Sequence, residues 1–257
     1  MTASERTQLD QLGYLIWPNF MSLELLLALQ RRTEELFAQE GDSAGLEFRL
    51  EPNTRRLANL IAKDEVYRQI VVMPAILHAV SAVLGPRYKL SSLNARSANP
   101  NSESLQPLHA DMGLVADELG YAVCNTVWML DDFTEQNGAL RAVPNSHLWR
   151  RLPQTDMAGP NATHPGEVLI TGTAGTVVVM NAHVWHGGTA NRTDHPRRAL
   201  HGFFCRFDKP QQQYQRQLIP KEVQSAFSPE LRKVLALDDP LNDDLSAFAD
   251  RPSGFLR

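Results

Sequence analysis

The sequence has few cysteines and no cluster of positive charge. Of its 257 residues, only Cys124 and Cys205 are cysteines, and neither belongs to a Cys-x-x-Cys pair. A disulfide framework is therefore excluded as the source of stability, and a reducing compartment fits. The formal net charge is -4 and no basic run is present. This balance gives no reason to expect a nucleic-acid or anionic-membrane partner.

Long apolar runs are also missing. The N-terminal stretch MTASERTQLDQLGYL carries charges where a signal peptide needs an apolar core. The most apolar long stretch, residues 70–84, is interrupted by Pro74 and His78 and is too short to span a membrane. We therefore expect a cytoplasmic protein that does not associate with membranes.

The first part of the chain is predicted to be mainly helical. Ser22 can cap a helix in SLELLLALQRRTEELF that ends at Gly41. A second helical region covers roughly 64–84, where Pro74 suits the start of the last segment. We expect one domain over residues 1–257, with helical support in 1–86, a β core in 87–208 and a helical tail in 209–257.

Short strand-like runs separated by turn residues follow from about residue 87. These runs are YKLSSLNARSA, AVCNTVWML, GALRAVP, EVLIT, GTVVVMN and RALHGFFCRF. Many short strands at this spacing suggest a sandwich or barrel. Residues 150–166, rich in Pro, Gly, Asn and Thr, are predicted to form a surface loop. The predicted fold class is mostly β with flanking helices (α+β), around an antiparallel, double-layered β core.

The segment LHADMG carries the sharpest chemical signal. If it is a strand, His109 and Asp111 point to the same side and aim an imidazole and a carboxylate at one point. A second histidine would complete the two-His, one-carboxylate set typical of non-haem Fe(II) oxygenases. His186 and His183, both in GTVVVMNAHVWHGGTAN, compete for this place. We favour His186 because of the residues that follow it.

An arginine follows His186 at a suggestive distance. The stretch after His186 predicts a turn and a returning strand that begins at Arg197, with Arg197 and His201 on one face and Arg198 on the other. A guanidinium near the metal could pair with the distal carboxylate of 2-oxoglutarate. One member of the Arg197–Arg198 pair should be an ordinary surface arginine, and the spacing from His186 favours Arg197 as the binding residue.

Taken in order, these motifs closely resemble the phytanoyl-CoA dioxygenase family of Fe(II)/2-oxoglutarate-dependent oxygenases. The resemblance runs through DQLGYLIWPNFMSLELLLALQ, LHADMG, VWMLDDFTEQNGALRAVPNSH and WHGGTANRTDHPRRAL. It implies a double-stranded β-helix (jelly-roll, cupin-like) core. It also implies Fe(II) held by His109, Asp111 and His186, with 2-oxoglutarate on Arg197. Dioxygen would be the second co-substrate, and ascorbate is a candidate stimulant.

The resemblance implies further contacts. Gln106 resembles a co-substrate-binding position of fungal members, and Thr126 and Trp128 line up with the strand beside it, although Trp128 suits a plain core position equally well. Asn94, Arg96 and Met112 are assigned to the substrate side. Two positions depart from the family pattern. Gly188 stands where many members have Ser or Thr, and NSH at 145–147 replaces Gly-Ser-His, with His147 expected to be structural.

The resemblance implies oxidation of a small organic substrate, in most cases hydroxylation of an unactivated C–H bond in a secondary metabolite, with release of succinate and CO2. Desaturation, cyclisation and epoxidation remain open. Halogenation is disfavoured, because related halogenases lack the carboxylate that Asp111 supplies. A non-catalytic metal-binding β-barrel and a zinc hydrolase are the rival classes. Arg197 argues against the first, and the lack of a separate acidic motif argues against the second.

Substrate identity is not readable from the sequence. Arg49, Arg55 and Arg56 could form a basic entrance, or simply a solvated basic helix start. Residues 42–56, 99–104, 113–121 and 210–257 match nothing in the family and should set specificity. Monomer and homodimer both remain open.

Overall fold

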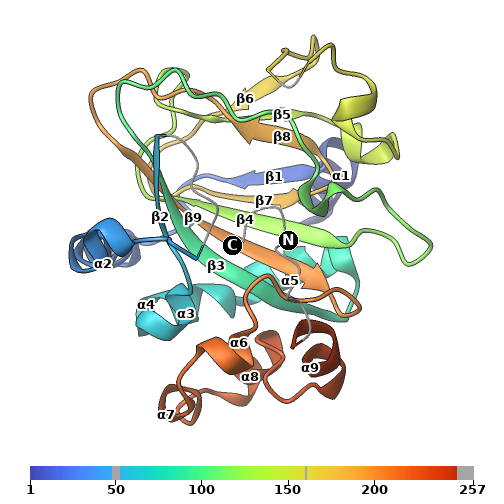
Figure 1. Ribbon diagram of the computed structural model, residues 1–257. Helices are drawn as coiled ribbons and strands as arrows, with labels where there is room; N and C mark the ends of the chain where they lie inside the picture. Colours follow the sequence, from blue (N-terminus) through green and yellow to red (C-terminus); the bar gives the residue numbers. More distant parts are fainter. Residues whose placement is uncertain (48–52, 160, 248–257) are drawn as a thin grey trace.

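Two antiparallel sheets face each other in the computed structural model, which describes residues 1–47, 53–159 and 161–247. The six-stranded sheet has the order β1-β7-β4-β9-β3-β2 and the three-stranded sheet the order β6-β5-β8. Figure 1 shows the smaller sheet above the larger one, and the C-terminal helices below. The strands are β1 (Tyr14–Trp17), β2 (Thr54–Leu57), β3 (Tyr88–Ala98), β4 (Val123–Met129), β5 (Leu140–Val143), β6 (Val168–Ile170), β7 (Val177–Asn181), β8 (Trp185–Gly188) and β9 (Arg197–Arg206).

Eight of the helices, α2 to α9, lie on the side of the larger sheet that points away from the smaller one, whereas α1 packs beside the edge strand β1 (Figure 1). All nine lie within the described residues. They are α1 (Ala3–Leu12), α2 (Leu23–Glu40), α3 (Leu60–Lys63), α4 (Glu65–Val71), α5 (Pro74–Leu84), α6 (Gln215–Leu218), α7 (Lys221–Gln224), α8 (Pro229–Val234) and α9 (Pro240–Ser246). Among them, α5 packs on β4 and β7, and α8 packs on β3. The predicted fold class is confirmed.

The helix starts follow the sequence signals. The Ser22 side chain accepts a hydrogen bond from the Leu25 backbone at 3.2 Å and so caps α2, and Gly41 follows the last residue of that helix. Pro74 occupies the first turn of α5, where its missing N–H has no cost. Within the described residues, no single helix is long and apolar enough to cross a membrane, and α4 and α5 pass such a test only together, bent by 51°.

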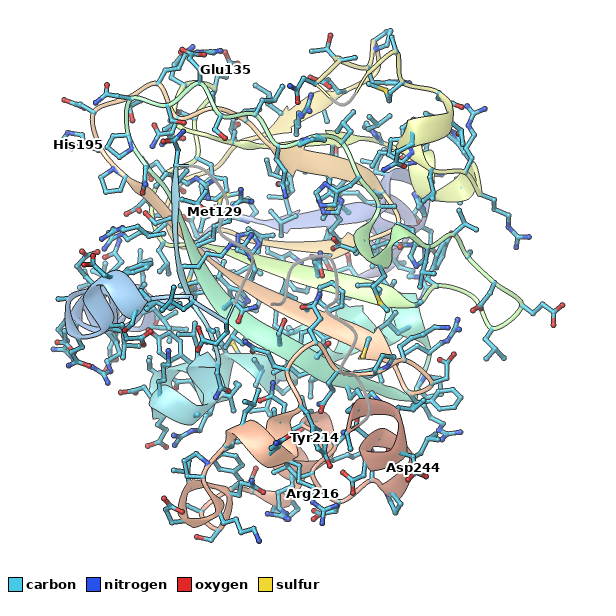
Figure 2. All side chains as sticks on the ribbon, viewed as in Figure 1. Met129, Glu135, His195, Tyr214, Arg216 and Asp244 are labelled. Atoms are coloured by element: carbon cyan, nitrogen blue, oxygen red, sulfur yellow. The ribbon has the colours of Figure 1, made fainter. Side chains whose placement is uncertain are left out.

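The C-terminal helices are joined to the sheet through buried glutamine contacts. Gln211 Nε2 donates to the carbonyl oxygens of Leu90 in β3 and Leu235, at 2.7 and 3.0 Å. Figure 2 shows Arg216 and Asp244 on these helices and Tyr214 just before α6, whereas Glu135 and His195 lie on loops at the opposite end of the molecule. The residues just after β9 are thereby held against the larger sheet.

Two strands lie in the region predicted to be helical, and both are short. β1 pairs with β7, and β2 pairs with β3 at the sheet edge. β2 has the sequence TRRL, which lacks an apolar–polar alternation because its inward residue Arg56 faces a polar cavity rather than the core. This correction matters for the site, because β2 forms one of its walls.

Alternation along the strands of the larger sheet separates core from cavity. On β4, Cys124 and Trp128 pack toward the helices, while Val127 and Met129 face the smaller sheet. On β9, Leu200 and Phe204 also join the core on the helix side. The space between the two sheets receives the opposite set of side chains, and the candidate site lies there.

Candidate metal and co-substrate site

The segment before Asp111 runs along the free edge of β8. The Gln106 backbone N donates to Gly188 O at 2.9 Å, and His109 and His186 exchange two backbone hydrogen bonds of 2.9 and 3.0 Å. The Asp111 backbone N then donates to Ala182 O at 2.9 Å. This pairing sets the imidazole of His109 beside that of His186, with their ring centroids 4.4 Å apart.

The local structure differs from the strand predicted for LHADMG. His109 forms only an isolated bridge with His186, and Asp111 opens a 3-10 turn, Asp111–Gly113. Met112 in that turn has a left-handed φ of 57°. The backbone therefore bends away directly after Asp111, but the two side chains still meet.

His109, Asp111 and His186 offer one ligand atom each, all within 4.8 Å of one another. His109 Nε2 lies 3.5 Å from Asp111 Oδ1, and His186 Nε2 lies 3.7 Å from Asp111 Oδ2. In the part of the chain that the structure describes, this is the one such group of three or more potential ligands. Two imidazoles and one carboxylate form the donor set that suits non-haem Fe(II), and three ligands leave positions open.

Hydrogen bonds fix the orientation of these donors. His109 Nδ1 lies 2.9 Å from Pro107 O, and His186 Nδ1 lies 2.7 Å from Val184 O. Since a carbonyl oxygen only accepts, each Nδ1 carries a proton, and Nε2 is the ring atom of each histidine that faces the carboxylate and is placed to bind a metal. The Asn125 side-chain amide donates to Asp111 Oδ2 and orients that carboxylate.

The charge states of His186 and Asp111 fit a metal. Burial, together with nearby His109, lowers the pKa of His186 to about 4, so this imidazole is neutral at neutral pH. Burial raises the pKa of Asp111, but His186 and His109 outweigh it and lower that pKa to about 2. A neutral imidazole and an ionised carboxylate are the forms that bind a divalent cation. Burial lowers the pKa of His109, but the contact with Asp111 outweighs it and raises that pKa, so a bound metal would displace the Nε2 proton of His109.

His183, the competing histidine, is used elsewhere. Its Nε2 accepts from the Ala122 backbone N at 2.9 Å, and its Nδ1 lies 3.1 Å from Leu114 O. Both ring nitrogens therefore serve the backbone of the 114–122 segment, and His183 does not join the group of three.

Arg197 is buried on the inner face of β9, where it lines the same cavity as the three potential ligands. Its Nη2 donates to Gly138 O at 2.7 Å, and its guanidinium lies 4.1 Å above the Phe133 ring. Within the described residues its Nε has no hydrogen-bond partner. Burial, with Arg96 nearby, lowers the pKa of Arg197 to about 9, and a carboxylate in the cavity would satisfy both the charge and the free donor.

Arg198 does not line the cavity, as expected for one member of the pair, but it is ion-paired and not a solvated surface arginine. It points to the other face of β9 and forms a two-pronged ion pair with Asp131, in which Nη2 lies 2.7 Å from Oδ1 and Nε lies 3.0 Å from Oδ2. The two neighbouring arginines thus differ in face and in partner.

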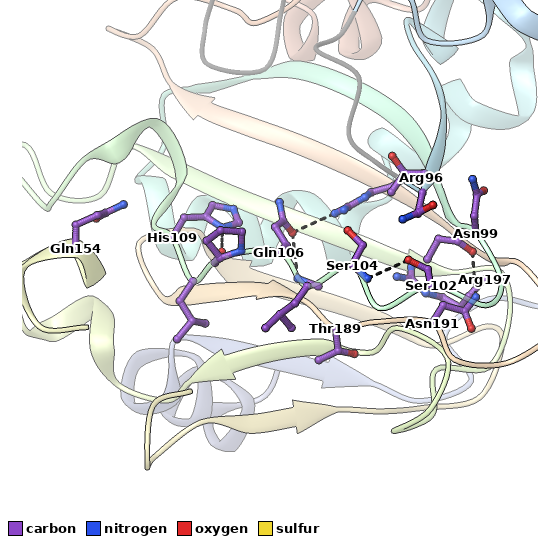
Figure 3. Close-up of a pocket in the computed structure, with 17 residues that line it drawn as sticks. Arg96, Asn99, Ser102, Ser104, Gln106, His109, Gln154, Thr189, Asn191 and Arg197 are labelled. Carbon is purple, nitrogen blue, oxygen red and sulfur yellow. Dashed lines mark hydrogen bonds between the residues drawn. The ribbon is translucent and has the colours of Figure 1, made fainter. Parts of the chain in front are cut away.

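Two adjoining cavities meet at this site. The inner cavity, about 130 Å³, is lined by His109, Asp111, His186 and Arg197. The outer cavity, about 350 Å³, shares His109 and Arg197 with it. Figure 3 shows Gln106 between His109 and Arg96, with hydrogen bonds from Arg96 Nη1 and the Gly188 backbone N to Gln106 Oε1 at 3.1 and 3.0 Å.

Several residues assigned from the sequence line these cavities. Gln106 and Arg96 line both, and Asn94 lines the inner one. Gly188 also lines both, and a Cβ there would lie 3.6 Å from Gln106 Oε1, so Gln106 fills the space next to this glycine. Met112 does not line either cavity and is 41% exposed, because the turn after Asp111 directs the chain outward; its assignment to the substrate is corrected.

Thr126 and Trp128 are a second correction, because neither faces a cavity. They lie on the helix face of β4, where Trp128 Nε1 donates to Thr126 Oγ1 at 3.1 Å and the Trp128 ring packs edge-on to Phe20. The inner face of β4 instead presents Asn125 and Val127. A shift of one residue along a strand exchanges its two faces, and the motif alignment chose the wrong one.

Trp128→Phe should therefore affect stability and not co-substrate binding. The change removes the buried hydrogen bond to Thr126 and part of the packed ring, so we expect unfolding to become easier by about 1–2 kcal/mol. Denaturant unfolding measures this loss, and a 2-oxoglutarate titration should match the wild type within about twofold. Weaker 2-oxoglutarate binding at unchanged stability would contradict the core assignment.

The remaining sequence predictions fall at different places. His147 is buried with its Nε2 3.1 Å from Asp10 O, as expected for a structural histidine. Arg49 lies outside the described residues. Arg55 and Arg56 do not form a basic helix start, because they lie on strand β2. Arg55 lies 4.3 Å above the Phe37 ring, while Arg56 lines the inner cavity.

The segments expected to set specificity contribute unequally to the cavity walls. Residues 99–104 contribute Asn99, Ser102 and Ser104 to the outer cavity, and the tail contributes Gln212 to the inner one. Residues 113–121 contribute none of the residues that line either cavity.

Asn125, Phe133 and His201 were not predicted as site residues. The alternation along the predicted strand places His201 on the same face as Arg197, and this could have indicated that His201 belongs to the site. Asn125 could be found only by knowing which residues of β4 point inward. Phe133 lies on a loop, and no sequence pattern places its ring under Arg197.

Asn125→Leu should weaken metal binding. The Asp111 carboxylate would lose the donor that orients it, and loss of such a partner typically costs about 10–100-fold in metal affinity. Titration with Fe(II) under anaerobic conditions measures the effect, and thermal unfolding checks that the variant is folded. An unchanged affinity would show that Asp111 is oriented without Asn125.

Comparison with known proteins agrees with this geometry. The family model for phytanoyl-CoA dioxygenase (PhyH) matches residues 9–199. A dioxygenase af480 from Aspergillus fumigatus is 31% identical over 198 residues, 73% of this chain, and the chain spans only 61% of that relative's length. The chain belongs to the phytanoyl-CoA dioxygenase family of Fe(II)/2-oxoglutarate-dependent dioxygenases.

Solved structures show the same fold. HygX from Streptomyces hygroscopicus, with nickel and 2-oxoglutarate bound, superposes with a TM-score of 0.67 at 16% identity, covering 82% of this chain and 89% of HygX. EctD from S. alaskensis with bound Fe gives 0.67 at 19% identity, covering 80% and 77%. The antiparallel double-stranded β-helix predicted from the sequence is thus confirmed.

Proposed function

We propose that this chain uses Fe(II), 2-oxoglutarate and dioxygen to hydroxylate an unactivated C–H bond of a small organic substrate, with release of succinate and CO2. The main observation behind this proposal is that one cavity is lined both by the His109–Asp111–His186 group and by the buried guanidinium of Arg197. A purely structural metal site would not need a carboxylate-binding arginine beside it.

Each residue has a defined part in this proposal. His109 and His186 present Nε2 to the metal because their Nδ1 protons are held by backbone carbonyls. Asp111 supplies the negative charge and is oriented by Asn125. When bound, the iron activates dioxygen at the expense of 2-oxoglutarate and supplies the oxidant for the C–H bond.

The co-substrate would be held at its far end by Arg197. A guanidinium binds a carboxylate through two parallel hydrogen bonds, which selects a dicarboxylic 2-oxo acid over pyruvate. Phe133 and Gly138 keep the guanidinium in place.

Known relatives support a role in secondary metabolism. The fungal relative is named a dioxygenase. HygX has been solved with hygromycin B, and EctD with 5-hydroxyectoine. These molecules belong to those proteins, and for this chain they suggest a small-molecule substrate.

Metal exchange separates the proposal from a zinc hydrolase. The chelator-treated protein should form no succinate from 2-oxoglutarate in air, Fe(II) with ascorbate should restore succinate formation, and Zn(II) should not, because zinc has no redox chemistry. Succinate release is the readout, with heat-denatured protein as the control. Restoration of a hydrolytic activity by Zn(II), without succinate, would overturn the proposal.

A further inference from the structure

The inner cavity contains a polar pair that the metal and co-substrate roles do not use. Asn94 on β3 and His201 on β9 stand directly opposite each other in the strand register. Both line the cavity that contains His109, Asp111 and His186. Cross-strand neighbours on one face are close enough to contact a common group.

Both side chains have a buried atom with an unused hydrogen-bonding capacity. Among the described residues, neither Asn94 Oδ1 nor His201 Nε2 has a hydrogen-bond partner. An unsatisfied buried polar atom costs about 1–3 kcal/mol, so two on facing residues call for a ligand. Ser92 and Phe203 are another facing pair of the same two strands. Ser92 does not need a ligand, because its Oγ already donates a hydrogen bond to Gln212 Oε1 at 2.8 Å.

The charge around the pair indicates what kind of ligand fits. Burial, with Arg96 and Arg197 close by, holds the pKa of His201 well below its ordinary value, so the ring is neutral. A neutral imidazole offers one donor and one acceptor, and an amide offers both kinds. Asp111 is the one acidic side chain among the residues that line this cavity, so an ammonium group would find no counter-charge beyond the metal site. Three arginines also line it, but Arg197 is assigned to the co-substrate, Arg96 binds Gln106 and Arg56 has other partners, so the facing pair itself offers neutral groups.

Apolar side chains stand beside the pair. Val127 lies opposite His201 in the β4–β9 register, and Phe203 is two residues further along the same face of β9. Both line the cavity with Met180. A ligand here meets hydrogen-bonding groups at one point and apolar surface around it.

We infer that Asn94 and His201 form a subsite for an uncharged oxygen, a hydroxyl or carbonyl, on an otherwise apolar substrate skeleton. The subsite rests on the proposed function and adds to it the class of substrate. Holding one oxygen on this pair fixes the skeleton and determines which C–H bond faces the metal. Asn94 and His201 are then specificity-determining residues on the substrate side of the cavity.

The test uses three small probes of similar size on the full chain with Fe(II) and 2-oxoglutarate, without oxygen. Cyclohexanol and cyclohexanone carry the oxygen, and methylcyclohexane does not. The visible charge-transfer band of the Fe(II)–2-oxoglutarate complex reports both co-substrate binding and the approach of a probe. We expect both oxygenated probes to bind the wild type at least about fivefold more tightly than methylcyclohexane, as one net hydrogen bond provides.

Substitutions of Asn94 and His201 test whether the preference for oxygenated probes comes from these two residues. His201→Phe and Asn94→Leu should abolish the preference for oxygenated probes, and His201→Gln should retain part of it. All three should bind 2-oxoglutarate within about twofold of the wild type. Equal binding of all probes to the wild type, or a preference that survives in His201→Phe and Asn94→Leu, would overturn the subsite.

Two further outcomes are distinguishable from these. Weakened 2-oxoglutarate binding in the variants would assign the pair to the co-substrate and reject the subsite, while leaving the proposed function intact. Absence of the charge-transfer band in the wild type would overturn the proposed function and the subsite together.

Discussion

Arg197→Leu should raise the KM for 2-oxoglutarate by at least about 30-fold. Removing one partner of a buried, hydrogen-bonded charge pair costs about 2–5 kcal/mol, and 2 kcal/mol corresponds to about 30-fold. The guanidinium is buried in the cavity wall, and its free Nε points to a carboxylate as the absent partner. Succinate formation at varied 2-oxoglutarate measures the KM, and Arg197→Lys should lie between the variant and the wild type because lysine keeps the charge without the fork.

The chain offers a matched control one residue away. Arg198 is on the same strand, but its guanidinium pairs with Asp131 on the opposite face. Arg198→Leu should change the stability and leave the KM for 2-oxoglutarate within about twofold. Equal KM values for Arg197→Leu and the wild type would contradict the co-substrate role of Arg197, and so would equal increases in both variants.

Asp111→Gly should reduce 2-oxoglutarate turnover by at least about 100-fold. Loss of a residue that merely supports a metal ligand typically costs about 10–100-fold, and loss of the single anionic ligand should cost more. The two histidines would remain, but the site would lose its negative charge. Succinate formation and anaerobic Fe(II) titration together measure the loss.

Glu118→Gln is the control for this change. Glu118 is exposed and lies outside both cavities, yet it belongs to the same stretch of chain as Asp111. Its replacement removes one carboxylate and should leave turnover and metal affinity unchanged. Undiminished turnover by Asp111→Gly would be evidence against Asp111 as a ligand.

The sequence predicts most of the architecture because the core strands are apolar and separated by turn residues. β3, β7 and β9 were located from such runs. β2 was not, because its inward arginine faces a polar cavity and so its pattern does not resemble a half-buried strand.

The site was partly predictable for a different reason. The spacing of His109 and Asp111 is short, so their side chains meet even though the segment is a bridge and a 3-10 turn rather than a strand. The partner histidine is far along the chain, and only the pairing of residues 106–109 with β8 brings it close. The structure decides between His183 and His186, because both ring nitrogens of His183 already form hydrogen bonds with the backbone, whereas His186 keeps its Nε2 for the site.

The errors at Thr126 and Trp128 arise because alternate residues of a strand point to opposite faces of the sheet. Thr126 and Trp128 lie one residue away from the inward positions Asn125 and Val127, and the sequence of β4 is apolar on both faces. The sequence predicts the correct face for His201. It does not predict that His201 Nε2 has no hydrogen-bond partner among the described residues, because this depends on how β3 and β9 pair. The shape of a cavity depends on residues from several elements, so it cannot be predicted from the sequence pattern of one strand.

One measurement tests the central claim most directly: an anomalous-diffraction map of the protein crystallised without oxygen with Fe(II) and 2-oxoglutarate. The account predicts a single iron peak bonded to His109 Nε2, His186 Nε2 and Asp111, with 2-oxoglutarate chelating the iron and its far carboxylate on Arg197. Iron bound elsewhere, or 2-oxoglutarate bound away from Arg197, would contradict it.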